Sequence, residues 1–63
     1  PNLLAHLGSH VYNSMGVVLW RHGRMTQALE QYARALEIDP WNRMAAENLR
    51  TALRAGVERG GGP

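Results

Sequence analysis

The sequence contains no cysteine and no lysine. Without cysteine, the chain can form neither a disulfide framework nor a zinc site built from thiolates. The lack of cysteine does not identify a compartment, and a cytoplasmic location is only the default. All seven basic residues are arginines, and the formal net charge is only +2. Because these arginines are spread along the chain and mixed with glutamate, the pattern argues against a nucleic-acid interface.

Long apolar runs are also missing. A membrane-spanning helix needs about 20 apolar residues, and the longest run here, Gly16 to Trp20, has five residues. We therefore expect no membrane span. The 63 residues are 44% hydrophobic, which is enough for one small globular domain with a marginal core. The sequence starts at Pro1 rather than Met and shows no signal peptide, so we expect that processing or truncation removed residues upstream.

The first predicted helix begins near Leu3 and ends near His22. Apolar residues recur along it at spacings of three and four, which is typical of one helix face; they are Leu4, Leu7, Val11, Met15 and Val18. Gly8 costs a helix about 1 kcal/mol relative to alanine. The alternative is therefore a turn that ends at Ser9, which would then cap the helix. Gly23 is the expected C′ residue, because glycine adopts the left-handed conformation without cost.

The second predicted helix follows a turn at Arg24 and Met25, with Thr26 as its N-cap. It stops at Asp39-Pro40, because the residue before a proline is disfavoured in the helical conformation. Its apolar face recurs at helical spacing and consists of Ala28, Leu29, Tyr32, Ala35 and Leu36. Glu30 and Arg34 are spaced for an ion pair on the helix surface.

The third predicted helix runs from Arg43 to about Ala55, with Asn42 as its N-cap and Gly56 after its end. Its apolar face is formed by Ala45, Ala46, Leu49, Ala52 and Leu53. The opposite face is charged and carries Arg43, Glu47, Arg50 and Arg54. Residues 57–63 include three consecutive glycines and are predicted to form a flexible tail.

Residues 9–42 resemble one tetratricopeptide repeat (TPR), a helical hairpin of 34 residues with characteristic residues at set positions. The positions that carry the resemblance are Tyr12, Met15, Gly16, Leu19, Ala28, Tyr32, Ala35 and Pro40. The ending Ala-Leu-Glu-Ile-Asp-Pro, from Ala35 to Pro40, is also similar to the ending of that family's repeat. Leu19 departs from the pattern, which has Tyr at this position. Gly16 is expected to let the partner helix come close, because it has no side chain.

The third helix resembles the first helix of a following repeat, with Arg50 in place of the packing glycine. That departure and its charged face resemble the terminal capping helix that closes such arrays. The resemblance thus implies an all-α fold: a TPR-like antiparallel helical hairpin, followed by a capping helix, as a fragment of an α-α superhelix.

Proteins of this family bind other proteins, so the resemblance implies a non-catalytic interaction or scaffold module. Its partner-binding groove would be lined by the first helix, at His10, Asn13, Val17, Trp20 and Arg21. Trp20 and Arg21 are the strongest candidates, because Trp and Arg are enriched at binding hot spots. A carboxylate clamp of the kind found in some members is not expected: lysine is absent, and Ser14 stands where those members have Asn. The sequence contains no recognisable catalytic set, so no enzyme activity is expected.

Repeat arrays normally need about three repeats for stability, and this chain has about one and a half. The C-terminal side of the chain resembles a capped end, whereas its N-terminal side does not. The residues on that N-terminal side are Leu3, Leu4, Leu7, Val11 and Val18, together with Trp20. We expect this association seam to be covered by a second copy of the chain, by the rest of a larger repeat protein, or by another subunit of an assembly.

One other class of function stays open at this point. His6 and His10 are four residues apart and would share a helix face, which is a spacing that can chelate a transition metal or support a haem-associated protein. Neither histidine has a carboxylate close by in the sequence, so we expect no metal and no cofactor. Weak nucleic-acid binding through the arginines is the remaining alternative.

Overall fold

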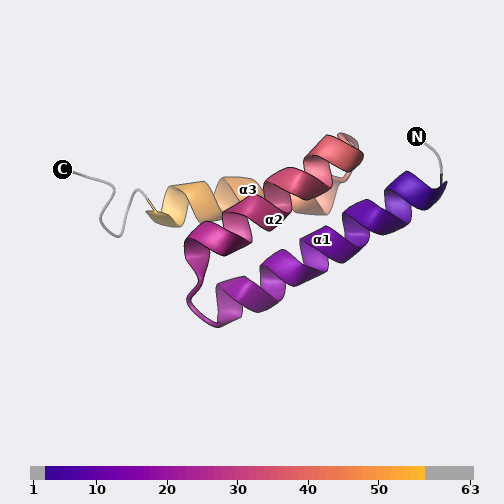
Figure 1. Ribbon diagram of the computed structural model, residues 1–63. Coiled ribbons are helices and arrows are strands. Elements are labelled where there is room, and N and C mark those ends of the chain that lie inside the picture. The colour runs from indigo at the N-terminus through magenta and orange to yellow at the C-terminus, as the bar shows by residue number, and fades with distance from the viewer. Residues whose placement is uncertain (1–2, 57–63) are drawn as a thin grey trace.

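The computed structural model describes residues 3–56, which form three helices (Figure 1). Helix α1 spans Leu3–Arg21, α2 spans Met25–Ile38 and α3 spans Arg43–Gly56. α1 and α2 form an antiparallel hairpin, and α3 packs mainly against α2 while touching α1 at few points. No strand occurs in the described residues. The predicted all-α fold is confirmed, whereas the predicted tail at 57–63 lies outside the described residues.

The turn between α1 and α2 depends on one glycine. Gly23 has a φ of 76°, a conformation that costs glycine little. The Gly23 amide donates to the Trp20 carbonyl at 3.0 Å, and the Arg24 amide donates to the Leu19 carbonyl at 2.9 Å. These two bonds form a Schellman motif, which satisfies carbonyls at the end of the helix. The prediction that Gly23 is the C′ residue is therefore confirmed.

This turn leads directly into α2, so one predicted cap is wrong. The N-cap of α2 is Arg24, which makes no side-chain capping bond, and Thr26 lies inside the helix. The Arg24 carbonyl already accepts the Ala28 amide at 2.9 Å. The Schellman turn places the start of the helix two residues earlier than a threonine cap would. The predicted stop at Asp39 is confirmed, because Asp39 is extended before Pro40.

α3 begins as predicted. Asn42 Oδ1 accepts the Ala45 amide at 3.0 Å, which is the bond of an asparagine N-cap. The helix includes Gly56 as its last residue, one position beyond the predicted end. α1 is unbroken through Gly8, so the alternative turn ending at Ser9 does not form. On α2, Arg34 Nε lies 3.6 Å from Glu37 Oε1, rather than pairing with Glu30 as predicted.

The core consists of small side chains around a single ring. Its buried apolar residues are Ala28, Tyr32, Ala35, Ala45 and Ala52. Gly16 lies against the Tyr32 ring, and a Cβ on Gly16 would come within 2.6 Å of Tyr32 Cδ1. A distance this short cannot be accommodated without a shift of the ring. Gly16 therefore allows the close approach that we predicted, and the group that it admits is an aromatic ring.

The molecule is an elongated slab. Its Cα radius of gyration is 11.8 Å, and its extents are 41 × 19 × 13 Å. A compact domain of this length would have a radius of about 10–11 Å. A slab only a helix or two thick has little interior, so much of its apolar surface stays in contact with solvent.

Candidate interaction surface

The largest exposed apolar feature lies along α1. Its members, which we call the apolar row, are Leu4, Leu7, Val11, Met15 and Val18. They are between 47% and 79% exposed, and the neighbouring Leu3 is exposed as well. At 1.5 Å per residue, the row from Leu4 to Val18 is about 21 Å long. None of the described helices is both long enough and apolar enough to cross a membrane.

The row is hollowed near its C-terminal end. A shallow cavity of about 340 Å³ is lined by Ser14, Met15, Val18 and Leu19. Three of its four lining residues are apolar, and two of them belong to the apolar row. An apolar side chain from another molecule could therefore be seated here without burying a charge.

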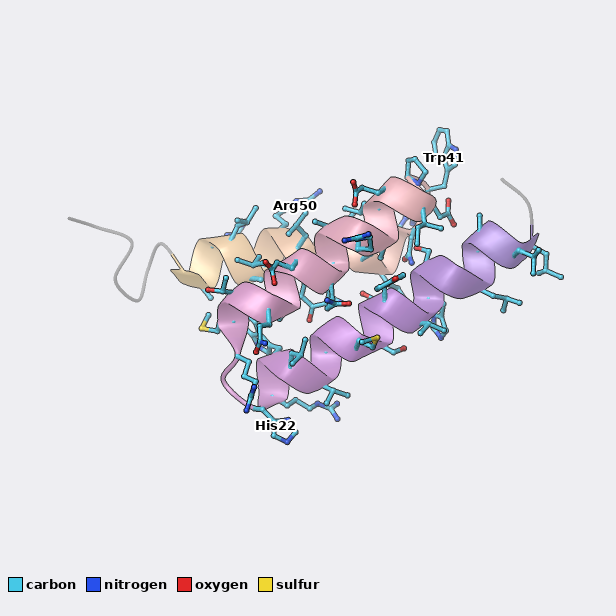
Figure 2. All side chains as sticks on the ribbon, viewed as in Figure 1. His22, Trp41 and Arg50 are labelled. Atoms are coloured by element: carbon cyan, nitrogen blue, oxygen red, sulfur yellow. The ribbon has the colours of Figure 1, made fainter. Side chains whose placement is uncertain are left out.

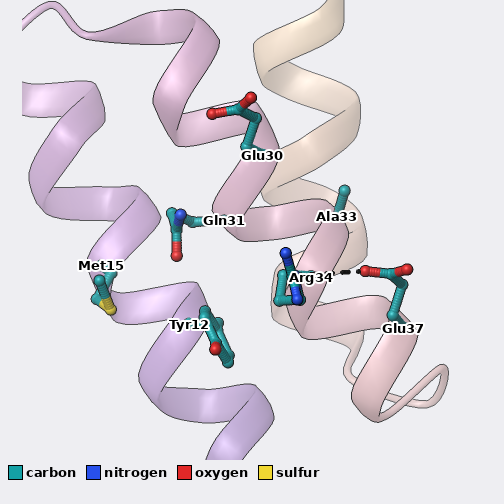
Figure 3. A pocket seen from close by; sticks show the side chains of 7 residues that line it. All are labelled: Tyr12, Met15, Glu30, Gln31, Ala33, Arg34 and Glu37. Atoms are coloured by element: carbon teal, nitrogen blue, oxygen red, sulfur yellow. Dashed lines mark ion pairs between the residues drawn. The ribbon is translucent and has the colours of Figure 1, made fainter.

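A second, more polar hollow of about 600 Å³ lies between α1 and α2 (Figure 3). Its lining residues are Tyr12 and Met15 from α1 and Glu30, Gln31, Ala33, Arg34 and Glu37 from α2. Gln31 extends from α2 toward α1, and its Oε1 is buried without a hydrogen-bond partner. Met15 lines both hollows, so the apolar row continues into a charged border on α2. Sequence reasoning missed this hollow, because its residues come from two helices. It named Tyr12 and Met15 for other reasons and considered Glu30 and Arg34 only as an ion pair.

The predicted groove residues do not all share an open surface. His10 and Arg21 are exposed, whereas Val17 and Trp20 are half-buried against the core. Asn13 is only 3% exposed, and its Oδ1 accepts a hydrogen bond from Asn48 Nδ2 at 2.9 Å. Asn13 thus connects α1 to α3, and its placement on an exposed groove is corrected. The bond spans 35 residues of sequence, so no local pattern could have indicated it.

A polar cluster joins all three helices at the N-terminal half of α1; two of its members are buried and the third is half-buried. We call it the polar hub; it contains Ser9, Asp39 and Asn42. Ser9 Oγ donates to the Ala35 carbonyl at 2.8 Å and accepts from Asn42 Nδ2 at 2.8 Å. Asp39 Oδ1 accepts the Trp41 amide at 3.0 Å. The hub therefore connects α1 to the end of α2 and to the start of α3.

The two histidines considered as metal ligands have different neighbours. His6 Nδ1 lies 3.5 Å from Asp39 Oδ2, which is a carboxylate that sequence proximity did not reveal. His10 is exposed. Within residues 3–56, histidine and acidic side chains do not gather in a group of three or more. The His6–Asp39 contact therefore attaches the start of α1 to the polar hub, and the geometry supports no particular metal site.

The surface of α3 is mixed rather than purely polar. Its arginines Arg43, Arg50 and Arg54 are exposed as predicted, but Met44 and Leu53 are exposed too. Trp41 projects into solvent from the turn between α2 and α3, and Arg50 points outward from α3 (Figure 2). These apolar side chains are separated by charged residues and form no continuous row like that on α1.

None of the known protein families, curated proteins or solved structures with which the chain was compared matches it. The surface itself is therefore the main guide to function. It offers an uncharged apolar row, a shallow apolar seat and a charged border, all on one side of the hairpin.

Proposed function

We propose that this chain is a non-catalytic protein-interaction module that binds a protein partner through the exposed side of α1. The observation that carries the proposal is the apolar row, whose side chains are about half exposed or more. Burying a large aliphatic side chain contributes about 1.5–3 kcal/mol. Exposed apolar patches of this kind mark interaction sites in soluble proteins.

Two further features support the proposal. The resemblance of residues 9–42 to a TPR hairpin implies protein binding, and the motif glycine Gly16 lies against the motif aromatic Tyr32. The small core also leaves the slab with a limited stability of its own, since a chain of this length is typically stable by only about 3–9 kcal/mol. A partner that covers the row would add to that stability.

The test compares two substitutions at sites of equal exposure. Val18 on α1 and Leu53 on α3 are both 53% exposed, so replacing each with glutamate adds a charge without opening a buried cavity. The tagged chain, Val18→Glu and Leu53→Glu would be used to capture proteins from an extract of the source cells, with circular dichroism confirming that all three are helical. We expect the wild-type chain and Leu53→Glu to retain the same partner, and Val18→Glu to lose it.

The assignment of the surface would be wrong if Val18→Glu retained every partner of the wild-type chain. A second copy of the chain counts as a protein partner in this experiment. For that reason, the self-association of each variant has to be measured separately, as described below.

A further inference from the structure

The apolar row has a symmetry in its spacing. Val11 is its centre: Leu7 and Met15 lie four residues to either side, and Leu4 and Val18 lie seven residues to either side. The successive spacings are therefore three, four, four and three. A regular heptad pattern of alternating threes and fours would not be mirrored about a residue in this way.

A row that is mirrored about one residue is self-complementary when two copies of the helix run antiparallel about a two-fold axis at that residue. In such an interface the same patch is used on both subunits, so a residue i that contacts j must also be contacted by j. If two α1 helices run antiparallel with the axis at Val11, Leu7 faces Met15 and Leu4 faces Val18 in both directions. Every member of the row then meets an apolar member of the other row.

The charges of α1 favour the same arrangement. No residue of the row is charged, and no acidic residue occurs between Leu3 and Arg21. Arg21, at the end of α1, is exposed. In an antiparallel pair centred on Val11, the two Arg21 residues would be separated by 20 helical residues, or about 30 Å, so their repulsion would be screened. A parallel pair would place them side by side.

We infer that the partner that fits the apolar row is a second copy of this chain, packed antiparallel through α1 with Val11 on the two-fold axis. This inference rests on the proposed function and names its partner. No member of the row is charged, and its mirrored spacing is complementary to itself. A single helix per subunit makes a small interface, at the low end of the usual range, so the dimer is expected to form reversibly with concentration.

The first measurement is the molar mass of the 63-residue chain by sedimentation, over concentrations from about 1 µM to about 1 mM. The chain has a mass of 7.0 kDa. We expect the mass to rise toward twice that value, Leu53→Glu to behave like the wild-type chain, and Val18→Glu to remain at 7.0 kDa. A wild-type mass of 7.0 kDa at every concentration would overturn the inference.

The second measurement tests the geometry, and it does not depend on a glutamate variant that folds. The chain has no cysteine of its own, so any disulfide must involve the cysteine that was introduced. A disulfide needs Cβ atoms about 3.5–4.5 Å apart, so its formation shows which positions of two subunits lie close together. Val11→Cys should form a disulfide-linked dimer on mild oxidation. Leu7→Cys and Met15→Cys should cross-link to each other in a mixture, and poorly when each is alone. Leu53→Cys is the control and should not cross-link beyond random collision.

These outcomes separate the two proposals. Strong cross-linking of Leu7→Cys to itself would indicate a parallel pair and overturn the antiparallel register. If the wild-type chain stays monomeric while Val18→Glu still loses a captured protein, the dimer is wrong and the proposed function stands. If Val18→Glu changes neither the mass nor the capture, both are wrong.

Discussion

At the scale of the residue, two glycines inside α1 have different surroundings. A methyl group on Gly8 would lie 3.9 Å from Ile38 Cγ2, which is an ordinary contact, whereas one on Gly16 would collide with the Tyr32 ring. Gly8→Ala should therefore raise the free energy of unfolding by about 0.5–1 kcal/mol, because alanine loses less conformational entropy on folding. Gly16→Ala should lower it by about 1–3 kcal/mol through overpacking. Urea denaturation at one fixed protein concentration measures both changes.

The two substitutions are matched, because each adds one methyl group to the same helix. Equal changes in stability would show that the Tyr32 ring does not set the distance between α1 and α2. The increase in stability expected for Gly8→Ala could be predicted from helix propensity alone. The decrease in stability expected for Gly16→Ala depends on a residue in another helix.

Tyr32 also predicts a dependence on alkaline pH. Burial raises the pKa of the Tyr32 phenol, because the phenolate would lose its hydration. In the unfolded chain the phenol ionises near its ordinary pKa of about 10. The contribution of this group to stability is therefore complete below about pH 10 and is lost as the pH rises toward the higher folded-state pKa. We expect the free energy of unfolding to fall above about pH 10, and Tyr32→Phe to flatten that fall in urea titrations. Parallel falls in the two proteins would refute this assignment.

At the scale of the element, the polar hub fixes how the three helices meet. Ser9 is fully buried in α1, donates to the Ala35 carbonyl of α2 and accepts from the Asn42 side chain that caps α3. Ser9→Ala removes both bonds and leaves a partly buried amide hydrogen of Asn42 without its acceptor. We expect a loss of about 1–3 kcal/mol in the free energy of unfolding, measured by thermal and urea denaturation.

Ser14 provides the control for this substitution. It lies on the same helix but is exposed, so Ser14→Ala should change stability by less than about 0.5 kcal/mol. If Ser9→Ala were equally mild, the hub would contribute nothing beyond what water provides to the same groups.

The helices themselves could be predicted from the sequence far better than the contacts between them. Gly23, Asp39-Pro40 and Asn42 each act on residues within four positions, so local chemistry is enough to place the helix boundaries. The prediction of Thr26 as the N-cap was wrong, because α2 begins directly after the Schellman turn at Gly23, before Thr26 is reached. The Ser9–Asn42 and Asn13–Asn48 bonds span 33 and 35 residues, and they exist only because folding brings those helices together.

On the candidate surface, too, features within one helix could be predicted and features formed between helices could not. The apolar row could be predicted, because its members recur at helical spacing on one face of one helix. Their exposure depends on which face of α1 the other helices cover, and the spacing alone does not determine that. The hollow that includes Gln31 and Glu37 could not, because it depends on how the side chains of α1 and α2 meet, which the prediction of a hairpin does not specify. Asn13 was assigned to a groove because of the resemblance to the TPR family, but its hydrogen bond to Asn48 on α3 places it in the interior.

At the scale of the whole molecule, the three helices differ in how extensively they pack against one another. α2 lies between the other two and packs against both, whereas α3 packs mainly against α2 and is connected to α1 through few contacts. The second half of α3 has one buried residue, Ala52, and ends in exposed positions. The α1–α2 hairpin should therefore tolerate damage at the end of α3, while damage in α2 should affect every contact.

Two proline substitutions at exposed helical positions test this hierarchy. Proline inside a helix costs about 3 kcal/mol or more wherever the helix must stay intact. Ala33→Pro breaks the middle of α2 and should abolish the helical circular dichroism signal of the whole chain. Thr51→Pro should remove only the helical signal of residues 51–56, because the chain can release that segment and the burial of Ala52 with it. The contact between the Tyr32 ring and Gly16, observed as a nuclear Overhauser effect, should survive in Thr51→Pro. Loss of that contact in Thr51→Pro would instead mean that the three helices fold as one cooperative unit. The α1–α2 hairpin would then not be stable without an intact α3.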